Sequence, residues 1–213
     1  MNGYSIPKAT LGRLPQYLQY LKSLPDTTCT TISATAIAKG LSLGEVQVRK
    51  DLAVVSGAGK PKVGYERTKL IDDLERNLGY EKLTNAVLVG AGKLGRALLD
   101  YDGFEEFGVR IVAGFDCNTQ ALQIGKSTKA ILPIKDIGTY CAQNNVKLGI
   151  VTVGQGSAQD VCDTLVSSGI EAIWNFAPVH LEVPPGILIQ TQNMATSLAV
   201  LSVHLQAQMK EKK

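Results

Sequence analysis

The sequence predicts an α/β protein in which a small helical domain precedes a parallel sheet with helices on both faces. Its 213 residues, 45% hydrophobic and 19% charged, suit one or two globular domains with a buried core. The hydrophobic pattern changes near residue 80, from helical spacing to apolar strands that alternate with helices. The pattern G-x-G-x-x-G at residues 90–95 follows such a strand and opens a helix, which is typical of a Rossmann-like domain.

Helical spacing dominates the first part of the chain. Leucines and Tyr17 recur every three or four positions, which predicts an amphipathic helix over residues 8–24. Ser33 is the expected N-cap of a second helix, which ends at Gly40. A third helix is expected to begin at residues 42–44. Its apolar positions are Val46, Val48, Leu52 and Val55.

A hairpin and a further helix follow. Residues 56–65, rich in glycine and lysine, predict the hairpin, and residues 68–78 return to helical spacing. Three helices and a hairpin match a winged helix-turn-helix domain, which we assign to residues 1–80. Its third helix would read the major groove of double-stranded DNA, and its hairpin, the wing, would contact the backbone or the minor groove. The residues expected to face DNA are Gln47, Arg49 and Lys50 on the helix and Lys60 and Lys62 on the wing.

The charge distribution permits DNA binding without requiring it. Residues 1–80 hold 11 Lys and Arg against 7 Asp and Glu, whereas the rest of the chain holds 11 against 12. A helical dimerisation module with a solvated charged face would have the same composition. Both interpretations of the N-terminal domain therefore stay open at this point.

The second domain, residues 83–190, is predicted from apolar strands that alternate with helices. Strands are expected at residues 86–89, 109–115, 131–134, 148–153, 170–174 and 187–190, and helices at residues 94–101, 135–144 and 157–168. A last helix over residues 193–209 carries an almost continuous apolar band. Such a helix must be buried against another surface, so we treat residues 191–213 as a separate segment.

The glycine fingerprint predicts a dinucleotide site. Gly90 allows a tight turn, Gly92 lets the backbone approach a pyrophosphate, and Gly95 lets helix and strand pack closely. Lys93 and Leu94 complete the fingerprint, where the helix N-terminus offers free N–H groups to phosphates.

An acidic residue at the end of the next strand specifies the cofactor. Asp116 lies 21 residues after the last glycine of the fingerprint, where a carboxylate accepts hydrogen bonds from the adenosine ribose. The same charge repels a 2′-phosphate, so NAD(H) is favoured over NADP(H). The alternative is a glycine-rich turn without a ligand.

No catalytic residue is predicted. The chain after Asp116 only completes the nucleotide-binding sheet, and His180 is the one plausible base within reach. We therefore expect a protein that is not an enzyme. The alternatives are a small NAD-dependent oxidoreductase with an N-terminal dimerisation module and a nucleotide-binding regulator of the CoA-ligase type, which shares this half-sheet.

The sequence shows no signal for export, membranes or metals. No apolar run reaches the ~18 residues of a membrane span, and the N-terminus lacks the apolar stretch of a signal peptide, so a cytoplasmic location is expected. Only two histidines are present, and no C-x-x-C occurs, so a metal site is not expected. Free thiols are expected at Cys29, Cys117, Cys141 and Cys162.

Five motifs together resemble the Rex family of redox-sensing transcriptional repressors. They are QVRKDL at 47–52, GK at 59–60 with VGY at 63–65, VGAGKLGRAL at 89–98, GFD at 114–116 and NFAP at 175–178. The resemblance implies a homodimer that binds operator DNA, with a winged helix and a Rossmann domain in each subunit. It also implies that NADH releases the protein from DNA, that NAD+ permits binding, and that the C-terminal helix is swapped into the partner.

The resemblance also implies roles for further residues. Tyr65 matches the close of the wing, and Thr152 and Val153 match the strand end that lines the cofactor pocket. Arg13 and Tyr101 match two members of a polar cluster that couples the cofactor to the angle between the domains. The segment near the nicotinamide is matched by Asn175, Phe176, Ala177 and Pro178.

The chain departs from the family pattern at three places. Pro61 and Lys62 replace the usual Arg-Gly of the wing, which removes the arginine expected in the minor groove. Ala195 stands where the family has the aspartate of the polar cluster. Gly154 and Gln155 replace the usual Pro-Ala after the Thr-Val strand.

Overall fold

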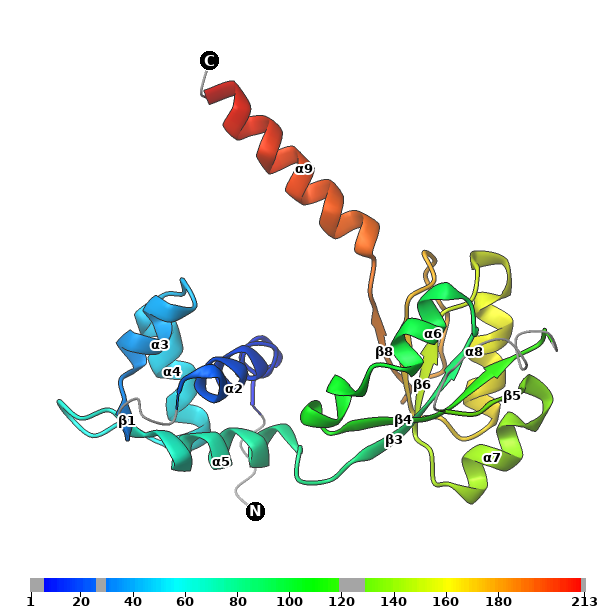
Figure 1. Ribbon diagram of the computed structural model, residues 1–213, viewed down its shortest axis with the longest axis horizontal. Helices are drawn as coiled ribbons and strands as arrows, with labels where there is room; N and C mark the ends of the chain where they lie inside the picture. Colours follow the sequence, from blue (N-terminus) through cyan, green and yellow to red (C-terminus); the bar gives the residue numbers. More distant parts are fainter. Residues whose placement is uncertain (1–5, 26–29, 119–128, 212–213) are drawn as a thin grey trace. The chain divides into compact units, whose positions relative to one another are not determined.

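A computed structural model describes residues 6–25, 30–118 and 129–211, which form two compact units (Figure 1). Unit 1 runs to Lys82 and includes Glu106–Gly108. Unit 2 comprises Leu83–Glu105 and the chain from Val109 onward. Cys29, one of the expected free thiols, lies outside the described residues.

Unit 1 is helical, with a two-stranded antiparallel sheet. Its helices are α1 (Lys8–Leu11), α2 (Leu14–Ser23), α3 (Ala34–Gly40), α4 (Glu45–Ser56) and α5 (Arg67–Leu78). Strand β1 (Thr31–Ile32) pairs with β2 (Tyr65–Glu66). The core between the helices consists of buried apolar side chains, among them Leu14, Tyr17, Leu21, Ile37, Val48, Leu52, Leu70 and Leu74.

The prediction of one continuous helix over residues 8–24 is wrong, because the chain breaks at Gly12 and Arg13 between α1 and α2. Pro15, in the first turn of α2, has no N–H, and in a continuous helix its ring would clash with the carbonyl group of Leu11. At the start of a new helix the missing N–H costs nothing. The leucine spacing predicts the buried face correctly but does not show the break.

The helix-turn-helix follows the prediction closely. The Ser33 side chain caps α3 by accepting a hydrogen bond from the backbone N–H of Ala36 at 3.0 Å. Helix α4 begins at Glu45 and buries Val48 and Leu52, as predicted. Val46 is a wrong core assignment, since its side chain is 65% exposed.

The wing turns at the two residues that depart from the family pattern. The backbone N–H of Lys60 donates to the carbonyl oxygen of Gly64. In return, the carbonyl oxygen of Lys60 accepts from the N–H groups of Val63 and Gly64. Lys62 adopts a φ of 65°, a left-handed conformation that glycine adopts more readily. The turn therefore persists although Lys62 replaces the usual glycine. Strand β1, with which the wing pairs, was not predicted.

Unit 2 contains a six-stranded parallel sheet in the order β5-β4-β3-β6-β7-β8. Its strands are β3 (Thr84–Val89), β4 (Val109–Asp116), β5 (Ile131–Pro133), β6 (Leu148–Val151), β7 (Ala172–Asn175) and β8 (Leu188–Thr191). The strand order reverses between β3 and β6. In a doubly wound sheet this point opens a crevice at the carboxyl ends of the strands. The six predicted strands and the Rossmann-like fold are confirmed.

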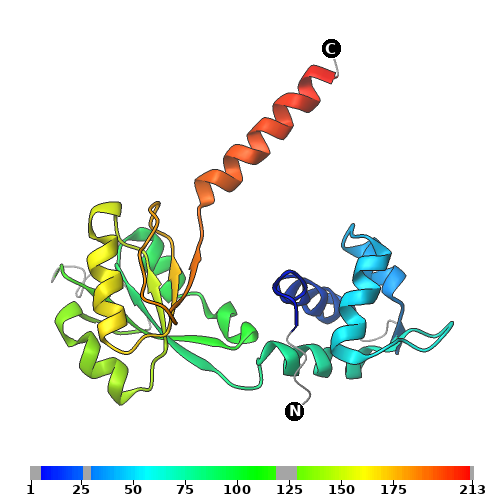
Figure 2. The same ribbon diagram turned by 180° about the vertical axis from the view of Figure 1, so that it is seen from behind.

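Helices cover both faces of this sheet (Figures 1 and 2). Val87 and Val89 belong to one core, with buried side chains of α7 (Ile137–Gln143) and α8 (Ala158–Ser167). Ala86 and Leu88, the alternate residues of the same strand, belong to the other core, beside α6 (Lys93–Leu99). The short 3-10 helices η1 (Asp102–Phe107), η2 (Ile134–Asp136) and η3 (Gln155–Ser157) complete the connections.

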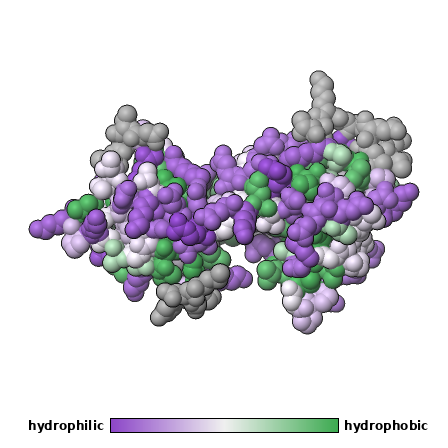
Figure 3. All heavy atoms as spheres, turned by 90° about the horizontal axis from the view of Figure 1, so that it is seen from below, coloured by the Kyte–Doolittle hydropathy of each residue, from purple (hydrophilic) through white to green (hydrophobic). Residues whose placement is uncertain are grey.

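The last helix, α9 (Met194–Glu211), has exposed side chains from Met194 to Lys210. The side chain of Asn193 caps it by accepting from the N–H of Thr196 at 3.0 Å. Its exposed apolar residues are Met194, Leu198, Val200, Leu201, Val203, Leu205 and Met209. Within the described ranges, no helix is both long and apolar enough to cross a membrane. On the face drawn in Figure 3, hydrophilic side chains predominate, with smaller hydrophobic patches among them.

Candidate dinucleotide and DNA-binding sites

The glycine loop, residues 90–95, lies where the strand order reverses and is held in place by close contacts. Gly90 has a φ of 106°, and a Cβ there would lie 2.9 Å from the backbone of Thr152. A Cβ on Gly95 would lie 1.9 Å from the carbonyl oxygen of Gly90. The hydroxyl group of Thr152 donates to that same oxygen at 2.8 Å and to the carbonyl oxygen of Val89 at 3.0 Å. Both glycines are therefore required by the contacts of the loop.

Gly92 differs from these two glycines, because a Cβ added to it would meet no atom within 4 Å. It is the N-cap of α6, and the exposed Lys93 and half-buried Leu94 form the start of that helix. The backbone N–H groups of a first helical turn lack partners within the helix and attract anions. An open space at the N-terminus of α6 fits the pyrophosphate of a dinucleotide.

Asp116 ends β4 beside this loop. One of its carboxylate oxygens accepts from the backbone N–H of Ala91 at 2.7 Å, and the other accepts from that of Asn118 at 2.8 Å. A carboxylate has about four acceptor positions, so each oxygen can still accept from a ribose hydroxyl group. Asp116 thus fixes the loop and also suits the predicted contact with the ribose.

A pocket of about 480 Å³ joins these groups, within the size range of small-molecule sites. Five predicted cofactor residues line it, namely Gly90, Gly92, Asp116, Thr152 and Val153. The prediction missed the other lining residues, Val89, Cys117, Ile134, Gly154, Ser157, Asp160, Val161 and Thr164. Ser157, the N-cap of α8, and Asp160, Val161 and Thr164 of that helix recur at spacings of three and four residues, so helical periodicity could have placed them on one face.

The segment NFAP follows β7 next to the end of β6, where the N–H of Phe176 donates to the carbonyl oxygen of Val151 at 2.9 Å. Asn175 is fully buried. Its side-chain amide donates hydrogen bonds to the carbonyl oxygens of Ala177 and Val179 and accepts one from the backbone N–H of Ala177. Its side chain therefore shapes this turn. The ring of Phe176 packs on that of Trp174, with centroids 4.4 Å apart. Contact of Asn175, Phe176, Ala177 and Pro178 with a nicotinamide stays a prediction.

Replacing Asp116 with alanine is expected to weaken NADH binding by about 10- to 100-fold, since hydrogen bonds to charged groups contribute about 1.5–3 kcal/mol. Loss of the charge should also narrow the preference for NADH over NADPH. Fluorescence titration with both nucleotides measures the two effects. Asp163→Ala, which removes an exposed carboxylate of α8 outside the pocket, is the control and should change neither. Undiminished NADH affinity of Asp116→Ala would remove this residue from the site.

Four of the six predicted DNA-binding residues line one groove of unit 1. Its volume is about 440 Å³, and it includes Arg49 of α4, Lys60 and Lys62 of the wing, and Tyr65 of β2. The residues at the start of α3, Ser33, Ala34 and Thr35, line it as well. The groove therefore combines three cations with the recognition helix and the wing, which is the composition expected of a DNA-binding face.

The three predicted DNA-binding residues of α4 differ in their surroundings. The guanidinium group of Arg49 forms an ion pair with the carboxylate of Glu45, one turn earlier on the same exposed face. Lys50 is exposed and lies outside the groove lining. Gln47 is exposed and also lies outside the groove lining.

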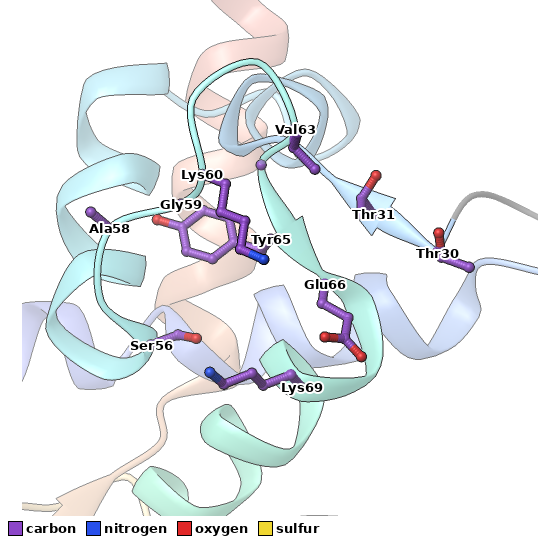
Figure 4. Close-up of a pocket in the computed structure, with 11 residues that line it drawn as sticks. Thr30, Thr31, Ser56, Ala58, Gly59, Lys60, Val63, Tyr65, Glu66 and Lys69 are labelled. Atoms are coloured by element: carbon purple, nitrogen blue, oxygen red, sulfur yellow. The ribbon is translucent and has the colours of Figure 1, made fainter.

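Tyr65 is a buried residue of the wing rather than a freely exposed one, at 6% exposure. A second groove, of about 380 Å³, lies beside it (Figure 4). The ring of Tyr65 packs so closely on Gly59 that a Cβ there would lie 2.9 Å from it. Its hydroxyl group is buried without a hydrogen-bond partner among the described residues. The structure thus gives Tyr65 a role in shaping the wing, and its contact with DNA stays a prediction.

A buried polar cluster joins α1 and α2 to α4. Asp51 is 4% exposed and accepts hydrogen bonds from the hydroxyl groups of Thr10 (2.9 Å) and Tyr17 (2.7 Å). Arg13 donates to both of its oxygens, at 2.7 and 2.8 Å. Burial alone would raise the pKa of the Asp51 carboxyl, but these bonds outweigh it and hold that pKa below its ordinary value. Burial and the bond to Asp51 raise the pKa of Tyr17 to about 12.

The sequence contained a signal for this cluster that the prediction did not use. Asp51 lies three residues after Val48 and directly before Leu52, on the buried side of α4. A carboxylate in such a position needs buried donors. Thr10, Arg13 and Tyr17 recur at spacings of three and four residues on the segment that packs against it.

Replacing Asp51 with alanine is expected to destabilise unit 1 by about 2–4 kcal/mol, because the buried hydroxyl groups of Thr10 and Tyr17 would lose their acceptor. A group whose pKa is lowered by folding contributes stability above its unfolded pKa, near 4, and that contribution is lost as the pH falls through the folded value. The difference between wild type and variant should therefore shrink below pH 4. Hydrogen exchange of the backbone amides of α2 and α4 in the full chain measures this difference in stability. Asp72→Ala, which removes an exposed carboxylate, is the control and should exchange like wild type. Equal protection of these amides in wild type and Asp51→Ala at pH 7 would contradict this account.

Tyr101 belongs to unit 2, whereas Arg13 belongs to unit 1. The side chain of Tyr101 is 54% exposed, and its ring lies edge-to-face on that of Phe104 with centroids 4.9 Å apart. Arg13 has its partners within its own unit, as described above. The predicted coupling of Arg13 and Tyr101 to the cofactor stays a prediction.

Comparisons with known proteins match both units. A family model described as "Putative DNA-binding protein N-terminus" matches residues 5–53, and one described as "CoA binding domain" matches residues 81–179. The redox-sensing transcriptional repressor Rex of Carboxydothermus hydrogenoformans is 40% identical over 207 residues, which cover 96% of this chain and 99% of the relative. That of Porphyromonas gingivalis is 37% identical over 196 residues, with 92% and 90% covered.

Solved structures agree with these relatives. The crystal structure of RSP in complex with beta-NAD+ and operator DNA gives a TM-score of 0.88 at 30% identity, over 98% of this chain and 96% of that chain. The structure of RSP in complex with beta-NADH gives 0.84 at 29% identity, with both chains fully covered. A further RSP structure is described as that of a Rex-family repressor.

Proposed function

Because the chain belongs to the Rex family of redox-sensing transcriptional repressors, we propose that it binds operator DNA as a homodimer and is released when NADH binds. The observation that carries this proposal is the presence in one chain of both sites: a basic groove on a recognition helix and wing, and a dinucleotide crevice at the reversal point of a parallel sheet. The solved complexes of RSP with NAD+ and operator DNA and with NADH support it.

The crevice would hold the cofactor through groups already described. The first turn of α6 would bind the pyrophosphate, and Asp116 would bind the adenosine ribose. NAD+ and NADH differ by one positive charge and by the planarity of the nicotinamide ring, which we place near the NFAP turn. Only a difference in affinity between two protein conformations lets a ligand shift their populations. Release from DNA therefore requires that NADH prefers the conformation that fits the operator less well.

We propose that α9 makes the homodimer, as the swapped helix of the family does. Its apolar residues are exposed on most sides of the helix, with Leu198 at 67% and Leu201 and Val203 at 64%. A helix of this kind is stable in water only when it is buried against another surface. A two-fold dimer would present two recognition helices to two half-sites of a palindromic operator.

The direct test is binding to a palindromic operator selected from random duplexes, with NADH and NAD+ titrated separately. Fluorescence anisotropy at a fixed salt concentration should show release by NADH and persistent binding with NAD+. If NADH leaves the complex intact at saturation, the sensor function fails even if DNA binding survives. Absence of any selected duplex would overturn the proposal as a whole.

Replacing Arg49 with alanine is expected to reduce operator affinity tenfold or more, since a bidentate arginine contact discriminates by about 1–3 kcal/mol. The loss should be larger for the operator than for random DNA. Arg76→Ala removes the same charge from α5 of the same unit, outside the groove, and should have little effect. Anisotropy titrations with both duplexes measure this. Equal dissociation constants for wild type and Arg49→Ala would contradict its role.

CoA is a second candidate ligand, because residues 81–179 match a CoA-binding family model. The adenosine of CoA carries a 3′-phosphate, which the carboxylate of Asp116 would repel, whereas the free ribose hydroxyl groups of NADH suit it. We therefore favour NAD(H). Competition between CoA and bound NADH in a fluorescence titration separates the two, and displacement at equal concentration would favour CoA.

The chain is a regulator rather than an enzyme, in agreement with its relatives, which are named as transcriptional repressors. This overturns the alternative of a small oxidoreductase. His180, the one base that such an enzyme could use, is exposed. A repressor acts where its operator DNA lies, so we propose that the protein is cytoplasmic.

A further inference from the structure

A basic groove lies on each side of the wing. The groove of about 440 Å³ described above reaches Arg49 of α4, whereas the second groove, of about 380 Å³, reaches Lys69 of α5. Both grooves are lined by the same residues of the wing and of β2, namely Gly59, Lys60, Gly64 and Tyr65. The wing is therefore a wall that the two grooves share.

Two lysines from different elements line the second groove. Lys60 extends toward it from the wing, and Lys69 extends toward it from the first turn of α5 (Figure 4). Both residues are exposed, and within the part of the chain that the structure describes neither forms an ion pair. The second groove therefore offers two ammonium groups to an anion.

The other polar groups of this groove suit a phosphate. Thr30 and Thr31 line it with their hydroxyl groups, and hydroxyl groups and lysines are common partners of DNA phosphates. The hydroxyl group of Ser56 is already used, because it donates to the carboxylate of Asp73 at 2.6 Å. Glu66 is the one acidic residue among the described lining residues, so the lining keeps a net positive charge.

The place of the second groove beside the wing indicates which phosphate it would meet. The minor groove of B-DNA is about 6 Å wide, and a sugar–phosphate strand runs along each of its edges. A wing that lies in the minor groove therefore meets phosphates on both of its sides. The first groove opens toward the recognition helix, so the second groove would face the strand at the other edge.

We propose that the second groove binds a backbone phosphate of double-stranded DNA, with Lys69 and Lys60 as its cations. This makes α5 part of the DNA-binding surface, although Lys69 was not among the predicted DNA-binding residues. A phosphate carries no base information, so the contact adds affinity without sequence preference. The carboxylate of Glu66 repels the same phosphate and limits this affinity. The inference rests on the proposed function, since it concerns the same complex with DNA.

The test compares the salt dependence of DNA binding for full-length wild type and variants, on the selected operator and on random duplexes. Lys69→Ala should weaken binding to both duplexes by the same factor and reduce the slope of log affinity against log salt by about 1. Lys69→Arg keeps the charge and should keep the wild-type slope. Arg76→Ala removes a cation two turns later on α5, outside both grooves, and should leave the slope unchanged.

A gain of affinity is expected from Glu66→Gln, which a loss of stability could not imitate. The amide keeps an oxygen that can accept from the hydroxyl group of Thr68, as the carboxylate does at 3.2 Å. Without the repelling charge, binding to both duplexes should strengthen by about two- to fivefold at low salt. Asp72→Asn removes the same charge from an exposed position of α5 outside both grooves and should have a much smaller effect.

Equal salt slopes for wild type and Lys69→Ala would overturn the inference, and a groove that binds a free anion instead of DNA would give this result. A reduced slope in Lys69→Arg would show that the lysine acts through the structure, which also overturns it. A loss confined to the operator would identify a base contact instead of a phosphate contact. In each of these cases wild type still binds its operator, so the proposed function stands. If wild type selects no duplex, the proposed function fails first and the inference with it.

Discussion

Replacement of Gly95 by alanine is expected to abolish NADH binding and to destabilise unit 2. A Cβ at this position would lie 1.9 Å from the carbonyl oxygen of Gly90 and 2.9 Å from the hydroxyl oxygen of Thr152. The first neighbour is backbone and cannot rotate away, so α6 must move from the strand or the loop must open. Overpacking of this kind costs typically about 1–3 kcal/mol, and the loop would lose its geometry at the pyrophosphate position.

Gly92→Ala is the matched comparison, because the same methyl group added there meets no protein atom within 4 Å. Its φ of −71° is ordinary for any residue. This variant should unfold at the same urea concentration as wild type, yet bind NADH at least tenfold more weakly, since the methyl group occupies the space of the phosphates. Urea unfolding and NADH fluorescence titration on both variants check this. Normal NADH binding by Gly92→Ala would show that the dinucleotide does not lie on this loop.

Much of unit 2 follows from sequence because its signals are local. A strand, a glycine fingerprint and a helix occupy adjacent residues, and Asp116 ends the neighbouring strand, so one parallel pairing brings them together. The continuous apolar run of β3 also predicts a strand that is buried on both faces. Val87 and Leu88, which are neighbours in the chain, do lie in two different cores. Predictions of this kind need no knowledge of distant contacts.

The parts that sequence did not reveal depend on contacts between distant residues. The split of the first helix is an exception, because Pro15 is a local signal whose effect at a helix start differs from its effect in a helix interior. The cluster around Asp51 joins residues 34 to 41 positions apart, so no local pattern displays it. Strand β1 consists of two residues only and exists because the wing pairs with it.

Placing glutamate at both Leu201 and Leu205 of α9 is expected to convert the protein to a monomer and to lower operator affinity about 100-fold or more. These side chains are 64% and 56% exposed and lie one turn apart on the helix. Burial of two carboxylates in an apolar interface is costly, so the proposed dimer would not form. A dimer that binds two half-sites gains a factor of about 10²–10⁴ over a single half-site, and the monomer loses this gain.

Gln206→Glu with Gln208→Glu adds the same charges to the same helix at polar positions, and this control should stay dimeric with ordinary operator affinity. Light scattering gives the mass of each variant, and anisotropy gives its affinity. Because the glycine loop and Asp116 belong to unit 2 and α9 does not line the pocket, the monomeric variant should still bind NADH. Loss of NADH binding together with the dimer would mean that the partner subunit completes the cofactor site. A dimer with normal operator affinity would instead show that α9 is not the interface, and the mechanism of release would then need a different element to set the spacing of the recognition helices.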